Sequence, residues 1–154
     1  MQTLATQGAA VSRTVADAFA CLPGSRRFSK AQCEVVHRLA YAALAAGEFQ
    51  RAHRCYEWLV LYRGNDPRSW RGLAASAHAL EDYGQALLHW TLVSLLEPDA
   101  VDATLYAGRC QAQLGQVREA LDTFDLVRRH PGADPALRQQ AEQMLALLQQ
   151  RRAA

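Results

Sequence analysis

The chain has 154 residues, of which half are hydrophobic, and a formal net charge of +2. This length suits one domain with its own core but is short for two. Because acidic and basic residues nearly balance, no basic field favours a nucleic-acid partner. No apolar run approaches the roughly 20 residues of a membrane-spanning helix. Asp17 interrupts the apolar N-terminus, so the sequence predicts neither membrane insertion nor a signal peptide.

The first predicted element is a helix over residues 8–21, which Pro23-Gly24 separates from the rest of the chain. Apolar residues recur along one stripe of this helix, namely Val11, Val15, Ala18, Phe19 and Leu22. Such a stripe is typical of a helix that buries one face. Packing on the next helices of the chain is one interpretation of it.

Six further helices are predicted in three pairs, over residues 30–46 and 49–63, 67–80 and 83–96, and 101–114 and 117–130. The pairs repeat every 34 residues, as the positions of Ala52, Ala86 and Ala120 show. Large aromatic residues follow each of these alanines by four positions: Tyr56, Trp90 and Phe124. Small residues recur in the first helices: Ala40, Ala74 and Gly108. A period of 34 is the length of a tetratricopeptide unit, in which two antiparallel helices cross closely.

The ends of these helices carry recognisable signals. Ser29 with Gln32 resembles a capping box, and Asp66-Pro67 supplies an N-cap and a first helical residue. Gly47 and Gly115 suit the turn inside a unit, but Glu81 occupies the same slot in the middle unit. We therefore expect that turn to form without the conformational freedom of a glycine.

The last predicted helix, over 134–151, starts at Asp134-Pro135 and is amphipathic, so it should cover the apolar end of the third unit. The fold class is all-α: three tetratricopeptide-like pairs stacked as a short right-handed solenoid, with helices at both ends. The expected organisation is one structural domain with an N-terminal segment at 1–28, repeats at 29–133 (about 33–66, 67–100 and 101–133) and a capping helix at 134–154.

A stack of this kind leaves a concave groove, lined mainly by the first helix of each pair, that binds peptides. The positions expected to face it are His37, Tyr41, Leu44, Arg71, Ala75, His78, Leu105 and Arg109. For Arg71 and Arg109 a solvated surface without a ligand explains the charge equally well. Trp70 is assigned to the core between helices.

Two stretches resemble a narrower family: "AHRCYEWLVLYRGNDPRSWRGLAA", from Ala52, and "YAGRC", from Tyr106. Over about residues 33–130 the chain is similar to the class II chaperones of bacterial type III secretion. The resemblance implies a bacterial cytoplasmic chaperone that holds an extended segment of a hydrophobic translocator in its groove. The client would then stay soluble and unassembled until secretion.

The resemblance also implies particular residues and partners. Phe49, Tyr62 and Trp90 match positions that shape client pockets, although core packing explains Phe49 and Trp90 better. His37 and Leu44 stand where the family often has tyrosine, which implies a different pocket. The family commonly dimerises through its N-terminal region, which suggests a homodimer; the implied contacts are Val11, Val15, Phe19 and Leu22. Some relatives also assist a transcription activator.

No enzyme, metal site or cofactor is predicted. Cys33 and His37 share a helix face and could supply two metal ligands, but no second pair accompanies them. The four cysteines form no CxxC pair, which predicts reduced thiols. No nucleophile signature, GxGxxG or P-loop is present.

Two other binding roles stay open. A clamp for the acidic tail of a heat-shock chaperone is disfavoured, because the groove lacks the lysines and asparagines that hold a carboxylate. The main alternative is a repeat scaffold, or a chaperone for another secretion component such as a needle subunit.

Overall fold

The computed structural model describes residues 13–14, 17–18 and 27–153. Residues 27–153 form seven helices and no strand, which confirms the all-α prediction. The helices are α2 (Lys30–Ala45), α3 (Phe49–Arg63), α4 (Pro67–Ala79), α5 (Tyr83–Leu96), α6 (Val101–Gln113), α7 (Val117–Arg129) and α8 (Pro135–Ala153). Their bounds lie within two residues of those predicted from the sequence. Most of the predicted N-terminal helix lies outside the described residues.

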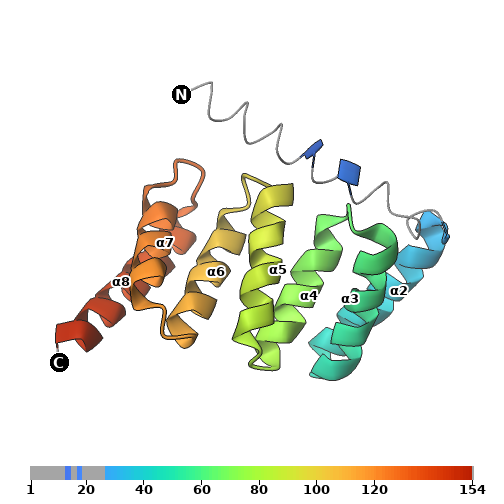
Figure 1. Cartoon of the computed structure of the whole chain (residues 1–154), viewed down its shortest axis with the longest axis horizontal. Helices are drawn as coiled ribbons and strands as arrows, with labels where there is room; N and C mark the ends of the chain where they lie inside the picture. Colours follow the sequence, from blue (N-terminus) through green and yellow to red (C-terminus); the bar gives the residue numbers. More distant parts are fainter. Residues whose placement is uncertain (1–12, 15–16, 19–26, 154) are drawn as a thin grey trace.

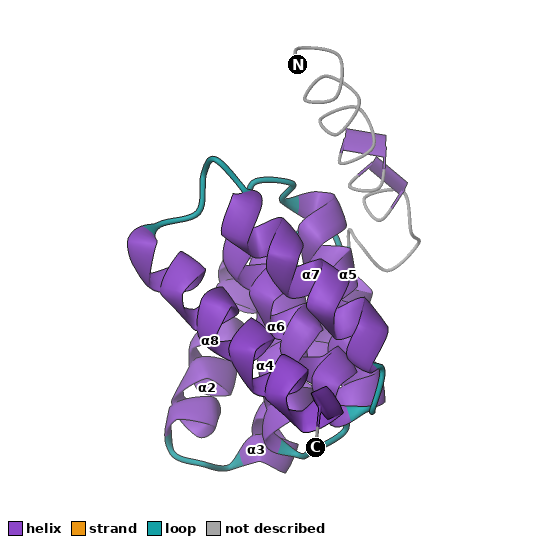
Figure 2. Cartoon of the chain, turned by 90° about the vertical axis from the view of Figure 1, so that its left-hand side faces the viewer, coloured by secondary structure: helices purple, strands orange, loops and turns teal. Residues whose placement is uncertain are grey.

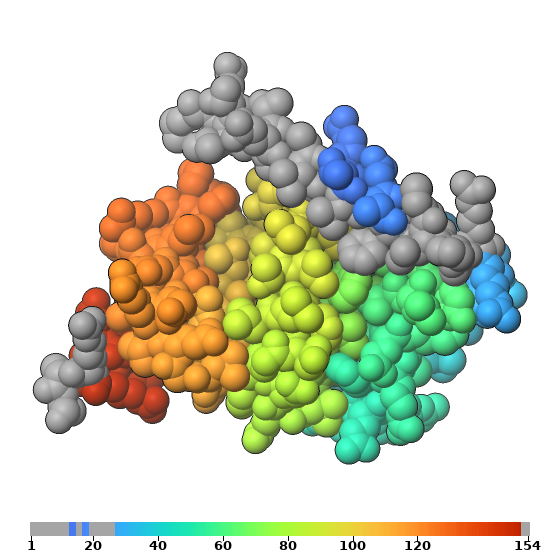
Figure 3. Space-filling view, viewed as in Figure 1, coloured from blue at the N-terminus to red at the C-terminus, as the bar shows by residue number. Residues whose placement is uncertain are grey.

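The helices stack in chain order along the long axis of the molecule (Figure 1). Each packs against the next, and α2 also contacts α4 as α6 contacts α8. Figure 2 looks along the stack, with the helices one behind another. On the face shown in Figure 3, the units lie side by side from α3 to α7. Three helix pairs and one further helix therefore form the predicted stack.

The helix starts follow the signals in the sequence. Ser29 and Gln32 form a reciprocal capping box, in which the Ser29 amide donates to Gln32 Oε1 at 2.8 Å and the Gln32 amide donates to Ser29 Oγ at 3.2 Å. The Asp66 carboxylate accepts from the Arg68 amide, and Pro67 is the first residue of α4. These caps satisfy amide groups that the helices leave unpaired, and so they fix where α2 and α4 begin.

The turns between paired helices share one backbone conformation. Gly47 and Gly115 have φ angles of 78° and 75°, and Glu81, in the equivalent slot, has a φ of 62°. The middle unit thus makes the same turn as its neighbours with a residue for which a positive φ is sterically unfavourable.

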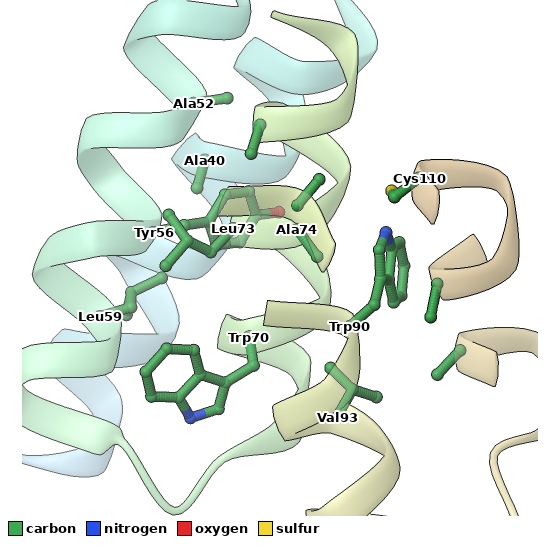
Figure 4. Packing of buried hydrophobic residues seen from close by; sticks show 14 of the residues in the cluster. Ala40, Ala52, Tyr56, Leu59, Trp70, Leu73, Ala74, Trp90, Val93 and Cys110 are labelled. Carbon is green, nitrogen blue, oxygen red and sulfur yellow. The ribbon is translucent and has the colours of Figure 1, made fainter. Parts of the chain in front are cut away.

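The core fills the space between the helices in two clusters, one over α2–α6 and one over α6–α8. The predicted close crossings are confirmed, since Ala40, Ala52, Ala74, Ala86 and Ala120 are fully buried. Figure 4 shows Tyr56 and Leu73 occupying the same interhelical space, and Trp90 beside the helix of Cys110. The aromatic residue of each repeat therefore fills the gap that the small residues leave.

Candidate peptide-binding surface

The surface formed by the first helices of the units, α2, α4 and α6, is here called the A-helix face. Its first unit presents the apolar groups. Tyr41 on α2 is 67% exposed, and Leu44, one turn later, is half-buried against the core. The two side chains combine an accessible ring with an aliphatic group that is already held in place. This pair can receive an apolar anchor from a peptide.

Arg71 on α4 lies in the middle of this face and connects α4 to α5 and α6. Its Nε donates to Glu97 Oε2, at the end of α5, at 2.8 Å, and its Nη2 donates to Asp102 Oδ1, on α6, at 3.2 Å. Burial lowers the pKa of Arg71, but the hydrogen bonds with Asp102 and Glu97 outweigh it and raise the pKa overall. Two carboxylates of the chain thus oppose the single charge of Arg71, and its role here is to tie α4 to α5 and α6.

Two further arginines link first helices across unit boundaries. Arg68 on α4 donates to Glu34 on α2 at 3.1 and 3.3 Å and also pairs with Asp66. Arg109 on α6 donates to Gln140 on α8 at 2.9 Å, while its guanidinium lies 5.2 Å from the centre of the Tyr106 ring. These links hold neighbouring first helices together along the A-helix face.

The two histidines predicted for the groove are half-buried. The His37 ring meets Tyr56 edge-on, with centroids 5.6 Å apart. His78 Nδ1 lies 3.4 Å from Cys110 Sγ, an arrangement that superficially resembles a nucleophile with its base. Burial, and then the charge of Arg109, lower the pKa of His78, whereas burial raises the pKa of Cys110 to about 11. Cys110 is therefore a protonated core thiol at neutral pH, since a nucleophilic cysteine needs a lowered pKa.

Two of the groove candidates lie in the core: Leu105, contrary to the prediction, and Trp90, in line with the core packing that was favoured for it. Leu105 is 1% exposed in the cluster that α8 completes, and Trp90 is 5% exposed and stacks on Tyr106 at 4.8 Å. Leu105 is buried because its unit is followed by one more helix, and Trp90 because it fills the gap between two units. Neither side chain is accessible to a peptide in this structure.

The remaining predicted residues lie in different places. Ala75 is half-buried in the A-helix face, and Phe49, 36% exposed, stands at the start of α3. The Tyr62 ring contacts Trp58 on the same helix, α3, and Phe28, which precedes α2. Its centroid lies 4.7 Å from that of each of these two rings. The predicted dimer contacts, Val11, Val15, Phe19 and Leu22, lie outside the described residues.

Some features of the surface were not predicted from the sequence. They include the Phe28 cluster and the Glu34–Arg68 pair. The Glu34–Arg68 pair could have been predicted, because these two residues have opposite charges and lie one repeat of 34 residues apart. A pocket of about 800 Å³ also lies between α7 and the end of α8, and it contains no predicted groove residue. Among the described residues, no cluster could hold a metal ion and no helix could span a membrane.

Comparison with known proteins agrees with this geometry. The sequence profile of the tetratricopeptide repeat family matches residues 37–91 and 77–134, and the chain belongs to that family. A search of curated proteins by sequence finds no match.

Solved structures narrow the class further. PcrH from Pseudomonas aeruginosa is 25% identical over 79% of this chain and 95% of its own, with a TM-score of 0.70. PcrH in complex with the chaperone binding region of PopD is 26% identical over 81% and 96%, with a TM-score of 0.74. The type III secretion translocator chaperone SycD from Yersinia enterocolitica shares the fold at 20% identity over 82% and 90%, with a TM-score of 0.75. The predicted resemblance to translocator chaperones of type III secretion is confirmed.

Proposed function

We propose that this chain is a translocator chaperone of a type III secretion system. It holds an extended segment of a hydrophobic translocator on the A-helix face and keeps that client soluble before secretion. The observation that carries the proposal is the likeness to PcrH, which has been solved with the chaperone binding regions of PopD and of PopB at 26% identity to this chain. In both complexes, the part of PcrH that resembles this chain covers about four fifths of it, 81% and 77%.

The surface supports apolar recognition. Arg68 and Arg71 are engaged by four carboxylates of the chain itself, so neither arginine is free to hold an acidic client. Tyr41 and Leu44 instead offer apolar area, whose burial contributes about 25 cal/mol per Å². Ordering an extended client opposes this attraction, so the complex should be of moderate affinity and able to dissociate for secretion.

The proposal includes a place in the cell and a set of partners. A chaperone of this kind works in the bacterial cytoplasm, without catalysis and without a cofactor. The partners proposed are one or more translocators, a second copy of this chain in a homodimer, and a transcription activator. SycD, which shares the fold at 21% identity, has been solved as an alternative dimer.

The test is co-expression with each translocator of the same organism, followed by titration of the client segment that is recovered. We expect a soluble complex, and we expect Tyr41→Ala with Leu44→Ala to weaken binding at least about tenfold. Leu126→Ala is the matched control, because Leu126 is 60% exposed on α7, outside the A-helix face. Failure with every translocator would overturn the function, whereas equal affinities of the two variants would move the client elsewhere on the surface.

A further inference from the structure

The pocket of about 800 Å³ at the last unit of the stack is lined by none of the residues predicted for the groove. Its walls include Val117, Arg118 and Leu121 of α7 and Leu148 and Arg151 of α8, and it is here called the α7–α8 pocket. A volume of this size falls in the range of small-molecule sites, roughly 300–1,000 Å³. The pocket is therefore a candidate ligand site distinct from the proposed client site.

The α7–α8 pocket is open because α8 continues where the other first helices end. α6 ends at Gln113, which corresponds to Leu147 one repeat later, but α8 extends to Ala153. Arg151 thus takes the slot of Val117, the first residue of α7. In the described part of the chain α8 is the last helix of the stack, and no second helix follows it (Figure 1). The pocket is the space beside α7 that such a helix would cover.

A further helix of the repeat type does not suit α8. In the three units the second helix crosses the first closely at Ala40, Ala74 and Gly108. The equivalent residue of α8 is Glu142, which is exposed. A helix that crossed α8 at this slot would bury the carboxylate, at a high cost in free energy. We therefore look for an occupant that is smaller than a helix.

The inner walls of the α7–α8 pocket are aliphatic. Leu148 is buried, and Ala112, Val117 and Leu121 are half-buried. A Cβ atom on Gly115 would meet no atom within 4 Å, so the open space reaches the turn between α6 and α7. The lining residues include no aromatic ring to stack on a base and no neutral polar side chain to hold the hydroxyl groups of a sugar. Such walls fit an aliphatic chain.

Two arginines stand at the rim of the pocket. Arg118 and Arg151 are exposed, and within the described residues no ion pair engages either of them. Arg68 and Arg71, in contrast, are held by carboxylates of the chain. Asp122 is the one acidic residue of the lining, so positive charge is in excess. Because guanidinium groups form strong charge-assisted hydrogen bonds with carboxylates, the rim suits an anionic head group.

The balance of charge reverses farther along α7. A second hollow of about 530 Å³ shares Leu121 and Asp122 with the α7–α8 pocket, and its other charged residues are Asp125, Arg128 and Glu142. Three carboxylates there oppose one guanidinium, which disfavours an anion. An amphiphile with an anionic head group would consequently place that group at the rim arginines and direct its chain toward the second hollow.

We propose that the α7–α8 pocket binds a free fatty acid. The carboxylate lies between Arg118 and Arg151, and the chain lies on Val117, Leu121 and Leu148. Because the aliphatic walls lie inside the rim, a chain has to leave a bilayer to reach them, which favours a free molecule over a membrane lipid. This site is independent of the client that the A-helix face holds.

Titration of the full chain with decanoate, below its micellar concentration, tests the proposal. In ¹H–¹⁵N NMR spectra the amides of Gly115, Val117 and Leu148 should shift in a saturable way, with a dissociation constant below about 1 mM. Decyltrimethylammonium has the same chain length and a cationic head group, so it should bind at least about tenfold more weakly. Equal affinities for the two amphiphiles, or shifts that occur only elsewhere on the chain, would overturn the proposal.

Variants locate the ligand within the pocket. Arg118→Ala and Arg151→Ala should each weaken decanoate binding at least about fivefold, because each removes a charge-assisted hydrogen bond. Arg38→Ala, at an exposed arginine of α2, is the matched control and should bind decanoate as the wild type does. Ala112→Phe should abolish binding by filling the pocket. If that variant does not fold, the two exposed arginine positions still decide, and wild-type affinity in both would reject the site.

Two other probes separate the fatty acid from other sources of the same chemistry. A peptide that ends in leucine presents a carboxylate beside a short apolar side chain, and anionic vesicles present head groups with their chains held in a bilayer. Decanoate should bind more tightly than the peptide, and the vesicles should not bind at this pocket. Tighter binding of the peptide, or binding of the vesicles alone, would overturn the assignment to a free fatty acid.

Discussion

Glu81 shows how a single residue can depart from its repeat while the backbone keeps to it. Its φ of 62° matches the turns at Gly47 and Gly115, whose φ angles are 78° and 75°. A side chain in this left-handed region clashes with its own backbone, at a cost on the order of 1 kcal/mol. The turn is therefore imposed by the packing of α4 and α5 on either side of it.

Glu81→Gly should accordingly stabilise the protein by about 1 kcal/mol, because it removes this clash. Denaturant unfolding followed by circular dichroism would measure the gain. Glu81→Ala is the control, since it removes the same charge but keeps a Cβ atom. The two variants should differ; if they are equally stable, the left-handed backbone carries no cost.

At the scale of the elements, the crossing of α3 and α4 depends on Gly72. A Cβ atom at this position would lie 2.1 Å from Cε1 of Tyr56, so the aromatic ring occupies the space that a side chain would need. Tyr56 is 2% exposed and cannot turn away into solvent. The absent side chain thus sets how closely α4 approaches α3.

Gly72→Ala should therefore lower the free energy of unfolding by roughly 2 kcal/mol, through overpacking at this crossing. Gly84→Ala is a matched control in α5, because the nearest atom to its added Cβ is 3.7 Å away. There the gain in helix propensity should leave stability unchanged or raise it by up to about 1 kcal/mol. Thermal unfolding of both variants would decide; a neutral Gly72→Ala would mean that the crossing is loosely packed.

The elements themselves were predictable, for physical reasons. The 34-residue period, the Ser29 capping box and the Asp66-Pro67 start are local signals, and each helix begins where they place it. The groove was less predictable. Leu105 has the register of a groove residue, but α8 completes a cluster over it, and no local pattern reports that coverage. Likewise, the carboxylates that hold Arg71 come from α5 and α6, so its pairing follows only from the assembled stack.

At the scale of the whole molecule, each helix is stabilised mainly by its contacts with the neighbouring helices of the stack. Every helix packs mainly against those next to it, so an end of the stack can open without the rest. The second cluster, which includes Phe124 and Val127, depends on α8 for Ala141 and Leu148. Loss of α8 packing should consequently be felt first in α6 and α7.

Ala141→Glu tests this order. It forces a charge into a fully buried site and should cost about 3 kcal/mol in the C-terminal part of the stack. Hydrogen exchange should accelerate in α6 and α7 well before α2 and α3. Ala146→Glu, at an exposed position of the same helix, should have little effect. Uniform acceleration over all seven helices would instead show that the stack unfolds as a single unit.

The internal pairing of Arg68 and Arg71 has a kinetic consequence. These two arginines face four carboxylates of the chain, so they add no net positive field that would steer an acidic client toward the A-helix face. Without that steering, capture proceeds at the ordinary rate of oriented protein encounter, about 10⁵–10⁶ M⁻¹s⁻¹. Such a rate hardly changes with ionic strength. An uncharged peptide should then bind the A-helix face equally fast in dilute and in concentrated salt.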